Sequence, residues 1–183
     1  MLLENNRLQL MPAAPALSEQ VCDYYCRNRE FLTPYDPLRE AIFFTEDYHR
    51  LLLSQDEAMA QCGRGYRFYI RLAEAPDRVV GTIALSNIVM GAFRSCFLGY
   101  KLDKDLLDQG YMTEAIGMVT EYAFQELQLH RIEANVMPWN GASLRVLEKN
   151  GYEREGISRE YLYINGKWED HVHMVRLNRD LRL

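Results

Sequence analysis

The sequence contains no apolar run near the length of about 18 residues that a membrane-spanning helix needs. Its first residues, MLLENNRLQL, lack the basic stretch followed by an apolar stretch that marks a secretory signal. Both absences argue against a membrane-spanning or exported protein. We therefore expect a cytoplasmic location and no membrane partner.

The sequence also lacks a net positive charge, and it has few cysteines. The formal net charge of −5 argues against a general nucleic-acid binder, but it is compatible with a cationic polypeptide or an amine as partner. Cys22 and Cys26 share a helix face, yet none of the four cysteines has a companion at metal-ligand spacing. We expect reduced, mostly buried thiols and no metal site.

The composition is that of a soluble globular protein, with 48% hydrophobic and 26% charged residues. A length of 183 residues suits one domain with a sizeable core, and the sequence shows no internal repeat, linker or low-complexity stretch. We therefore expect a single domain over residues 1–183, as a monomer or a homodimer.

Hydrophobic periodicity predicts the secondary structure. Alternation predicts strands at residues 7–11, 66–72, 79–89, 95–102 and 131–137, and three- and four-residue spacing predicts helices at 18–27, 45–62, 113–127 and 140–150. Two prolines predict an ordered, extended loop at residues 31–38, and Asn165-Gly166 predicts the turn of a C-terminal hairpin. This order of elements favours a mixed α/β layer structure.

A single glycine separates a loop-like run from a helix pattern in residues 106–115, LLDQGYMTEA. The backbone N–H groups of Gln109 to Thr113 would point at whatever lies at the helix N-terminus, where the helix dipole favours an anion. Gly110 permits close backbone approach, and the Thr113 hydroxyl can cap the helix or bind a phosphate oxygen. On these residues alone, a phosphate cradle and an ordinary strand-to-helix turn both remain open.

A second stretch, NVMPWNGASLRVLEKNGYEREG, places Asn140 after a strand and Ser143 in the first turn of a helix. Together the two stretches resemble the acetyl-CoA-binding motifs of the GNAT superfamily of N-acetyltransferases. The segments NREFLTPYDPLR, LSNIVMGAFRSCFLGY and REYLYINGKWEDHV extend the resemblance, over nearly the whole chain, to the RimJ branch of ribosomal-protein-alanine N-acetyltransferases. The resemblance implies the GNAT fold, in which a central, mostly antiparallel twisted sheet is flanked by helices.

The resemblance also implies how coenzyme A is held. The strand at residues 95–102 would offer backbone groups to the pantetheine arm, the next loop would hold the pyrophosphate, and Ser143 would lie close to the sulfur. The implied cofactor-binding residues are Tyr100, Lys101, Leu102, Gln109, Gly110, Tyr111, Met112, Thr113, Asn140 and Ser143. Leu107 and Asp108 depart from the family pattern, and a carboxylate beside two phosphates weakens binding unless it points to solvent.

Acetyl transfer to an amine requires a neutral amine, donors for the oxyanion and a proton for the thiolate. A backbone N–H around Leu98 to Tyr100 is the expected oxyanion donor. A peptide α-amino group has a pKa of about 7.7–8.0, so one modest base is sufficient. Related enzymes carry an acidic residue in the region of Glu160, which is either this base or a solvated surface residue. Ser143 either protonates the thiolate or makes only hydrogen bonds at a helix N-terminus.

The remaining candidate residues each have two interpretations. Tyr35 and Asp36 either grip the N-terminal residues of the substrate or form a structural turn. His171 and His173 share a strand face but have no further metal ligand, so the sequence favours core or edge histidines. Asp170 is expected to fix the terminal hairpin.

Three functions follow from these patterns. The first is an acetyl-CoA-dependent N-acetyltransferase that acts on a protein N-terminus, most simply that of a ribosomal protein beginning with Ala or Ser. The second is the same chemistry on a small amine such as a polyamine, an amino acid or an aminoglycoside. The third is a non-catalytic acyl-CoA-binding module, which the departures at Leu107 and Asp108 favour and the intact Asn140 and Ser143 disfavour.

Overall fold

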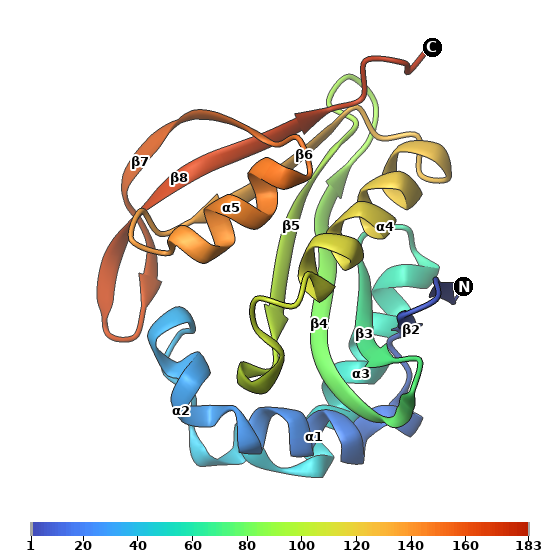
Figure 1. The fold of residues 1–183 in the computed structure, drawn as a ribbon, viewed down its shortest axis with the longest axis vertical. Coiled ribbons are helices and arrows are strands. Elements are labelled where there is room, and N and C mark those ends of the chain that lie inside the picture. Colours follow the sequence, from blue (N-terminus) through green and yellow to red (C-terminus); the bar gives the residue numbers. More distant parts are fainter. Residues whose placement is uncertain (1, 183) are drawn as a thin grey trace.

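A computed structural model describes residues 2–182 and builds one eight-stranded sheet in the order β1-β2-β3-β4-β5-β6-β8-β7 (Figure 1). All neighbouring strands are antiparallel except β5 and β6, so the predicted mixed α/β fold with a mostly antiparallel sheet is confirmed. The strands are β1 (Leu3–Glu4), β2 (Leu8–Pro12), β3 (Tyr66–Leu72), β4 (Ala75–Val89), β5 (Ser95–Leu102), β6 (Arg131–Val136), β7 (Glu153–Ile164) and β8 (Lys167–Leu177).

Five α-helices cover the two faces of this sheet: α1 (Ser18–Arg27), α2 (Arg29–Leu32), α3 (Glu46–Gln61), α4 (Tyr111–Gln125) and α5 (Gly141–Lys149). Phe68 packs in the core beneath α4 and α5, whereas its neighbour Tyr69 packs in a second core with α1 and α3. Successive strand residues point to opposite faces, so one helical layer lies on each side of the sheet. No helix within residues 2–182 combines the length and apolar character that a membrane crossing requires.

The sheet divides between β5 and β6. The parallel ladder holds only three residue pairs, from Ser95–Arg131 to Phe97–Glu133, whereas β5 stays paired with β4 as far as Leu102. From Leu98 onward the strands separate, and one edge of β5 is left without a neighbouring strand (Figure 1). The sequence predicts both strands but not this separation.

Three sequence-based expectations need correction. Residues 31–38 are not simply extended, because α2 and a 3-10 turn at Thr33–Tyr35 lie within or next to them. Helix α4 begins at Tyr111, with Gly110 as its N-cap, and no side chain caps it, so Thr113 is not the cap. The thiols are free as expected, but only Cys96 is buried; Cys26 and Cys62 lie at the exposed ends of α1 and α3.

Candidate active site

A cavity of about 310 Å³ lies where the edge of β5 meets the N-termini of α4 and α5. The 3-10 segment after α2 and the loop before α4 complete its wall. The structure thus brings together most of the residues proposed for cofactor and substrate binding, and those lining the cavity are Tyr35, Tyr100, Lys101, Leu102, Gly110, Tyr111, Met112, Thr113, Asn140 and Ser143.

Three proposed residues do not line this cavity. The Gln109 amide donates to Asp105 O (3.3 Å), and its own carbonyl accepts from Arg7. The Asp36 carboxylate is buried in ion pairs with Lys101 and Arg39. Glu160 is exposed on β7 with a φ of +49°, and its backbone N–H donates to Asp170 Oδ1 (2.8 Å). Asp170 therefore fixes the hairpin as expected, while the roles of Glu160, Asp36 and Gln109 stay predictions.

The N-terminus of α4 is a candidate anion site. Glu114 is the first residue of this helix whose N–H has a helical backbone acceptor, the carbonyl of Gly110 (3.1 Å), so the preceding N–H groups face the cavity end. Gly110 has a φ of +83°, a conformation that glycine adopts without strain, and a Cβ there would have only Arg7 Nη1 within 4 Å, at 3.9 Å. Conformation rather than space therefore requires this glycine.

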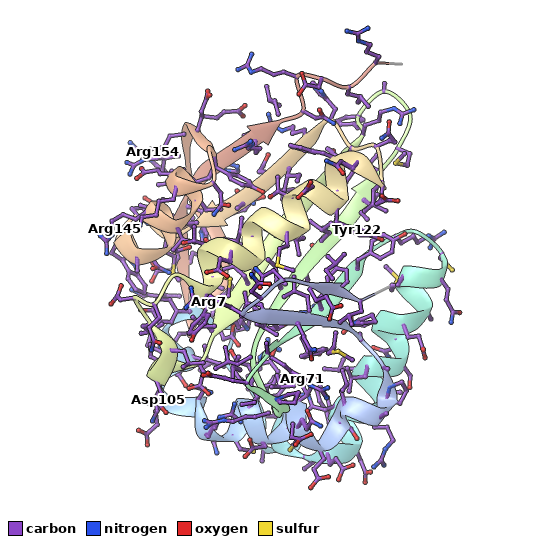
Figure 2. The ribbon with its side chains drawn as sticks, turned by 45° about the vertical axis from the view of Figure 1, so that its right-hand side comes forward. Arg7, Arg71, Asp105, Tyr122, Arg145 and Arg154 are labelled. Carbon is purple, nitrogen blue, oxygen red and sulfur yellow. The ribbon has the colours of Figure 1, made fainter. Side chains whose placement is uncertain are left out.

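Arg7 fixes the loop that forms this anion site (Figure 2). Its guanidinium donates to Gln109 O (3.0 Å), pairs with the Glu114 carboxylate and lies 4.2 Å from the centroid of the Tyr111 ring. The sequence gives no sign of this role, because Arg7 lies more than 100 residues away along the chain. The contact of this N-terminal segment with α4 depends on the pairing of the strands, which the sequence pattern does not reveal.

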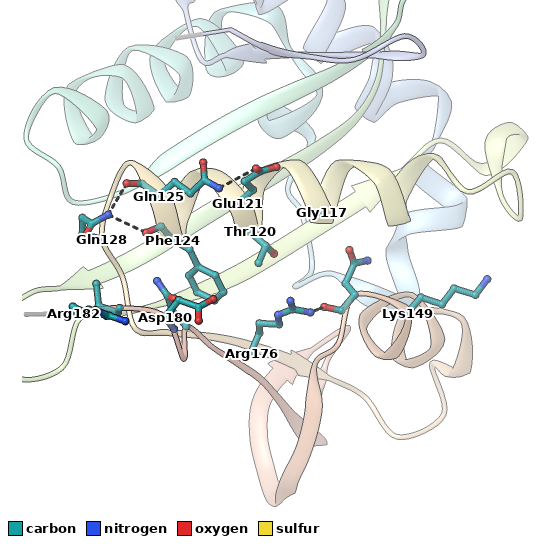
Figure 3. A pocket seen from close by; sticks show the side chains of 13 residues that line it. Gly117, Thr120, Glu121, Phe124, Gln125, Gln128, Lys149, Arg176, Asp180 and Arg182 are labelled. Atoms are coloured by element: carbon teal, nitrogen blue, oxygen red, sulfur yellow. Dashed lines mark hydrogen bonds between the residues drawn. The ribbon is translucent and has the colours of Figure 1, made fainter.

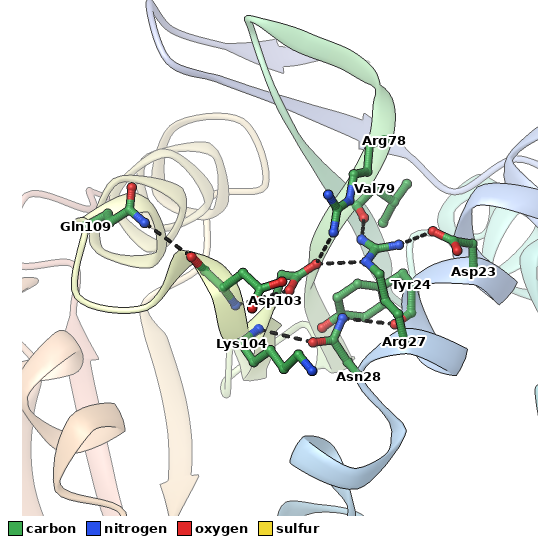
Figure 4. A network of polar contacts seen from close by, with 10 residues as sticks. Asp23, Tyr24, Arg27, Asn28, Arg78, Val79, Asp103, Lys104 and Gln109 are labelled. Atoms are coloured by element: carbon green, nitrogen blue, oxygen red, sulfur yellow. Dashed lines mark hydrogen bonds and ion pairs between the residues drawn. The ribbon is translucent and has the colours of Figure 1, made fainter.

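A polar network holds the end of β5 against α1 (Figure 4). The buried Asp103 carboxylate accepts from Arg27 Nε (2.9 Å) and Arg78 Nη2 (3.3 Å), and Asn28 Oδ1 accepts from Lys104 N (3.1 Å). Burial works to raise the pKa of Asp103, but hydrogen bonds from Arg27, Asp105 N–H and Asn28 outweigh it and hold the pKa below its ordinary value. An ionised Asp103 therefore anchors the segment that leads from β5 to the anion site.

Two hydroxyl groups in contact with each other line the cavity. Tyr100 Oη lies 2.6 Å from Ser143 Oγ, and Ser143 N donates to Asn140 Oδ1 (3.2 Å), which caps α5. Burial raises the pKa of Tyr100, and the hydrogen bond to Ser143 only partly offsets this, so the phenol stays protonated. The pair can therefore donate a proton into the cavity. The sequence indicated Ser143 but only the backbone of Tyr100.

Charges of both signs surround the cavity. Arg145, labelled in Figure 2, and Lys149 line it and can meet phosphate groups. Leu107 and Asp108, the two departures from the family pattern, line it as well. Asp108 has a φ of +59° and an exposed side chain. The structure thus places a carboxylate at the edge of the anion site.

A larger cavity of about 580 Å³ lies along the C-terminal half of α4 (Figure 3). Several polar groups in its lining are hydrogen-bonded to one another: Arg176 donates to Asn150 O, and the Gln128 side-chain amide donates to Phe124 O (3.3 Å) and Gln125 O (2.7 Å). These bonds lie at the C-terminal ends of α4 and α5, and none of the residues that line this cavity belongs to the first turn of a helix. We therefore take the smaller cavity as the candidate active site.

Metal-binding geometry is not found in the described part of the chain, since no group of three or more His, Cys, Asp or Glu residues could hold an ion. His171 is buried, and its Nδ1 lies 3.0 Å from Glu169 O. His173 contacts Glu133 and Ser158. Both histidines are bonded within the C-terminal part of the sheet.

Comparison with known proteins agrees with this geometry. Residues 7–153 match the model of the acetyltransferase (GNAT) domain family. The chain is 38% identical over 179 residues to the probable N-acetyltransferase YjcK of Bacillus subtilis (strain 168), with 98% of each chain covered. It is 36% identical over 155 residues to the ribosomal protein uS5-alanine N-acetyltransferase of Escherichia coli (strain K12), covering 84% of this chain and 78% of the relative. The crystal structure of the ribosomal-protein-S5-alanine acetyltransferase from Vibrio fischeri superimposes with a TM-score of 0.95, at 30% identity and full coverage of both chains.

Proposed function

Because the chain belongs to the GNAT acetyltransferase family and is therefore an acetyl-CoA-dependent N-acetyltransferase, we propose that it acetylates the N-terminal α-amino group of a protein. The most direct candidate is a ribosomal protein beginning with Ala or Ser. The names of the Escherichia coli and Vibrio fischeri relatives, both ribosomal-protein-alanine acetyltransferases, support this acceptor. Family membership favours an enzyme over the non-catalytic binding module.

The residues that line the cavity support one way of binding acetyl-CoA. The N–H groups at residues 110–113 and the dipole of α4 would hold the pyrophosphate, with Arg145 and Lys149 beside it. The free edge of β5 from Tyr100 to Leu102 would bond the pantetheine amides as a neighbouring strand would. One observation carries the proposal: a single cavity joins a helix N-terminus, an open strand edge and the Tyr100–Ser143 pair.

The chemistry then needs few groups. A backbone N–H of β5 around residues 98–100 would stabilise negative charge on the acetyl oxygen. The leaving thiolate would take a proton from Ser143, which Tyr100 replaces through their hydrogen bond. Acetyl passes directly to the amine within one complex, with no covalent enzyme intermediate.

The acceptor would approach past the segment that holds Tyr35 and Asp36. Tyr35 packs on Trp139 with ring centroids 5.3 Å apart, and Asp36 O accepts from Asn165 N (3.0 Å) at the tip of the β7–β8 hairpin. Its carboxylate is buried against Lys101 of β5. Asp36 therefore fixes the wall of the acceptor path, and Tyr35 is the more accessible of the two for contact with a substrate.

The test is free-thiol release from acetyl-CoA by the purified protein. The acceptors are peptides that begin with Ala, Ser or Met, and spermidine and lysine as small amines. Turnover confined to peptides that begin with Ala or Ser supports the proposal. Turnover confined to the small amines overturns it and assigns the same chemistry to a small acceptor. The Ser143→Ala variant controls for thiol release that does not arise in this cavity.

A further inference from the structure

Three strands bring together a hydroxyl, an imidazole and a carboxylate. His173 of β8 lies between the other two groups: its Nε2 is 2.7 Å from Ser158 Oγ of β7, and its Nδ1 is 2.8 Å from Glu133 Oε1 of β6. The side chains of His173 and Glu133 are only 18% and 16% exposed. We call this set the Ser158–His173–Glu133 relay.

The two hydrogen-bond partners of the His173 imidazole determine which of its ring nitrogens carries the hydrogen. An ionised carboxylate can only accept, so Nδ1 carries the hydrogen and Nε2 turns its lone pair to the Ser158 hydroxyl. Burial works to raise the pKa of Glu133, but hydrogen bonds from Arg131 and His173 outweigh it and hold the pKa below its ordinary value. Arg131 also pairs with Glu155 (2.6 Å), and the Tyr161 ring lies 5.0 Å from the imidazole centroid. Glu133 is thus a charged partner for a cationic imidazole.

The relay lies beside the point where the sheet divides. Glu133 is paired with Phe97 in the last pair of the β5–β6 ladder, and Asn135 is paired with His173. Directly paired residues point to the same face, so these side chains lie opposite the core that includes Ile132 and Ala134. Tyr100 shares that core face, because it stands an even number of residues from the buried Cys96. The relay and the Tyr100–Ser143 pair therefore lie on opposite faces of the divided sheet.

One further polar atom on the same face as the relay has no hydrogen-bond partner among the described residues. Asn135 Oδ1 is buried, and no hydrogen-bond donor within residues 2–182 reaches it. A buried, unsatisfied carbonyl oxygen is costly and calls for a donor. An amine that enters at the division of the sheet supplies such a donor. Asn135 and the relay thus lie next to each other on the face away from the candidate active-site cavity.

We propose that the Ser158–His173–Glu133 relay is the general base that deprotonates the acceptor amine, with Asn135 Oδ1 as a positioning group for a second N–H. This inference rests on the proposed acetyl transfer. An N–H proton of the acceptor passes to Ser158 Oγ while the Ser158 proton passes to His173 Nε2, and the cationic imidazole is paired with Glu133. The amine nitrogen bonds to the acetyl carbon, the C–S bond breaks, and the thiolate takes a proton from the Tyr100–Ser143 pair. Solvent returns the proton from His173 to that pair, so the reaction is balanced.

Glu160 is the rival base, and its surroundings differ. It is exposed, its backbone N–H is bonded to Asp170, and it stands in an irregular part of the β7–β8 pairing between Ser158 and Leu162. A base in that position would act from solvent, whereas the relay holds its imidazole between two fixed partners. The two assignments predict different variants to fail.

The experiment measures kcat against pH with saturating acceptor, whichever acceptor the wild type uses, so it does not depend on a peptide being the substrate. We expect His173→Gln to lower kcat by about 10²-fold or more with the acetyl-CoA Kd within about twofold. Glu133→Gln should move the acid limb of the profile to lower pH, because a cationic imidazole loses its carboxylate partner. His171→Gln is the matched control on the same strand face, because His171 contacts a backbone carbonyl rather than a carboxylate.

The outcomes separate the assignments. If His173→Gln and Ser158→Ala both keep kcat within about threefold and leave the profile unchanged, the relay is not the base. A loss of kcat confined to Glu160→Gln assigns the base to Glu160. If the His173→Gln variant melts at a much lower temperature than the His171→Gln variant, its loss of activity is not informative. The Ser158→Ala and Glu133→Gln variants then decide between the assignments, because both retain His173. Failure of the wild type on every acceptor would instead count against the proposed function.

Discussion

Replacing Asp108 by Asn is expected to tighten acetyl-CoA binding. Asp108 lines the candidate active-site cavity next to the N-terminus of α4, where the two phosphates of the proposed ligand would lie. Its backbone is left-handed, with a φ of +59°, and Asn tolerates this conformation well. The substitution therefore removes a negative charge without adding backbone strain. Asp108→Gly removes the charge as well and relaxes the backbone requirement.

The size of the effect follows from Coulomb's law. Two unit charges ~8 Å apart at an effective dielectric constant of ~40 interact by ~1 kcal/mol. At ~0.15 M salt, screening reduces this about threefold, so two phosphate charges together contribute ~0.7 kcal/mol, or about threefold in Kd. At ~0.01 M salt, screening is weak and the same repulsion reaches ~1.6 kcal/mol, or more than tenfold in Kd.

The assay is titration calorimetry of acetyl-CoA at both salt concentrations with wild type, Asp108→Asn and Asp108→Gly. Both variants should bind more tightly by the same factor, and the gain should shrink as salt rises. An unchanged Kd for both variants would show that the carboxylate points away from the phosphates. Tighter binding by Asp108→Gly alone would attribute the gain to the backbone and refute the electrostatic reasoning.

Other substitutions test the remaining parts of the structure. Ser143→Ala should lower kcat by about 10²-fold and change the acetyl-CoA Kd less than threefold, and Tyr100→Phe should act in the same direction. Stopped-flow thiol release measures kcat and calorimetry measures Kd. An equal loss of binding and turnover would argue against proton donation by this pair. Gly151 has a φ of +71° at the end of α5 and faces the Arg176 guanidinium, so Gly151→Ala should cost ~2 kcal/mol and lower Tm by ~4–8 °C; an unchanged Tm would contradict this. The lowered pKa of Asp103 stabilises the fold above about pH 4 and this contribution disappears as pH falls through the folded-state pKa, so Asp103→Asn should lower the free energy of unfolding in urea more at pH 7 than at pH 3. An equal loss at both pH values would mean that Asp103 acts without its charge.

Short sequence patterns predicted the helices, strands and turns whose conformation depends on residues close together in the sequence. The alternation in residues 131–136 sets the buried face of β6, and Asn165-Gly166 turns the terminal hairpin with positive φ at both residues. The gathering of Gly110, Asn140 and Ser143 around one cavity was also predictable, because they lie within short motifs next to helix starts. Each of these signals depends on neighbours in sequence.

Long-range contacts were not predictable in this way. Arg7 reaches the anion loop across more than 100 residues, and Ser158, His173 and Glu133 come from three strands whose pairing order no short motif encodes. The sequence indicated His173 only as an edge or core histidine. It gave no sign of the division between β5 and β6, because that depends on where a parallel ladder stops rather than on the residues of one strand.

The division of the sheet gives this protein an edge strand in the middle of its sheet. An unpaired strand edge usually invites another chain to add to it, and proteins protect such edges against aggregation. Here the edge of β5 from Tyr100 to Leu102 lines a cavity whose other walls include residues of α2, α4 and α5. These helices cover the edge in the way that proteins commonly protect an unpaired strand. The fold thus keeps a backbone-recognition surface available without the aggregation hazard that the same edge would pose at the rim of a sheet.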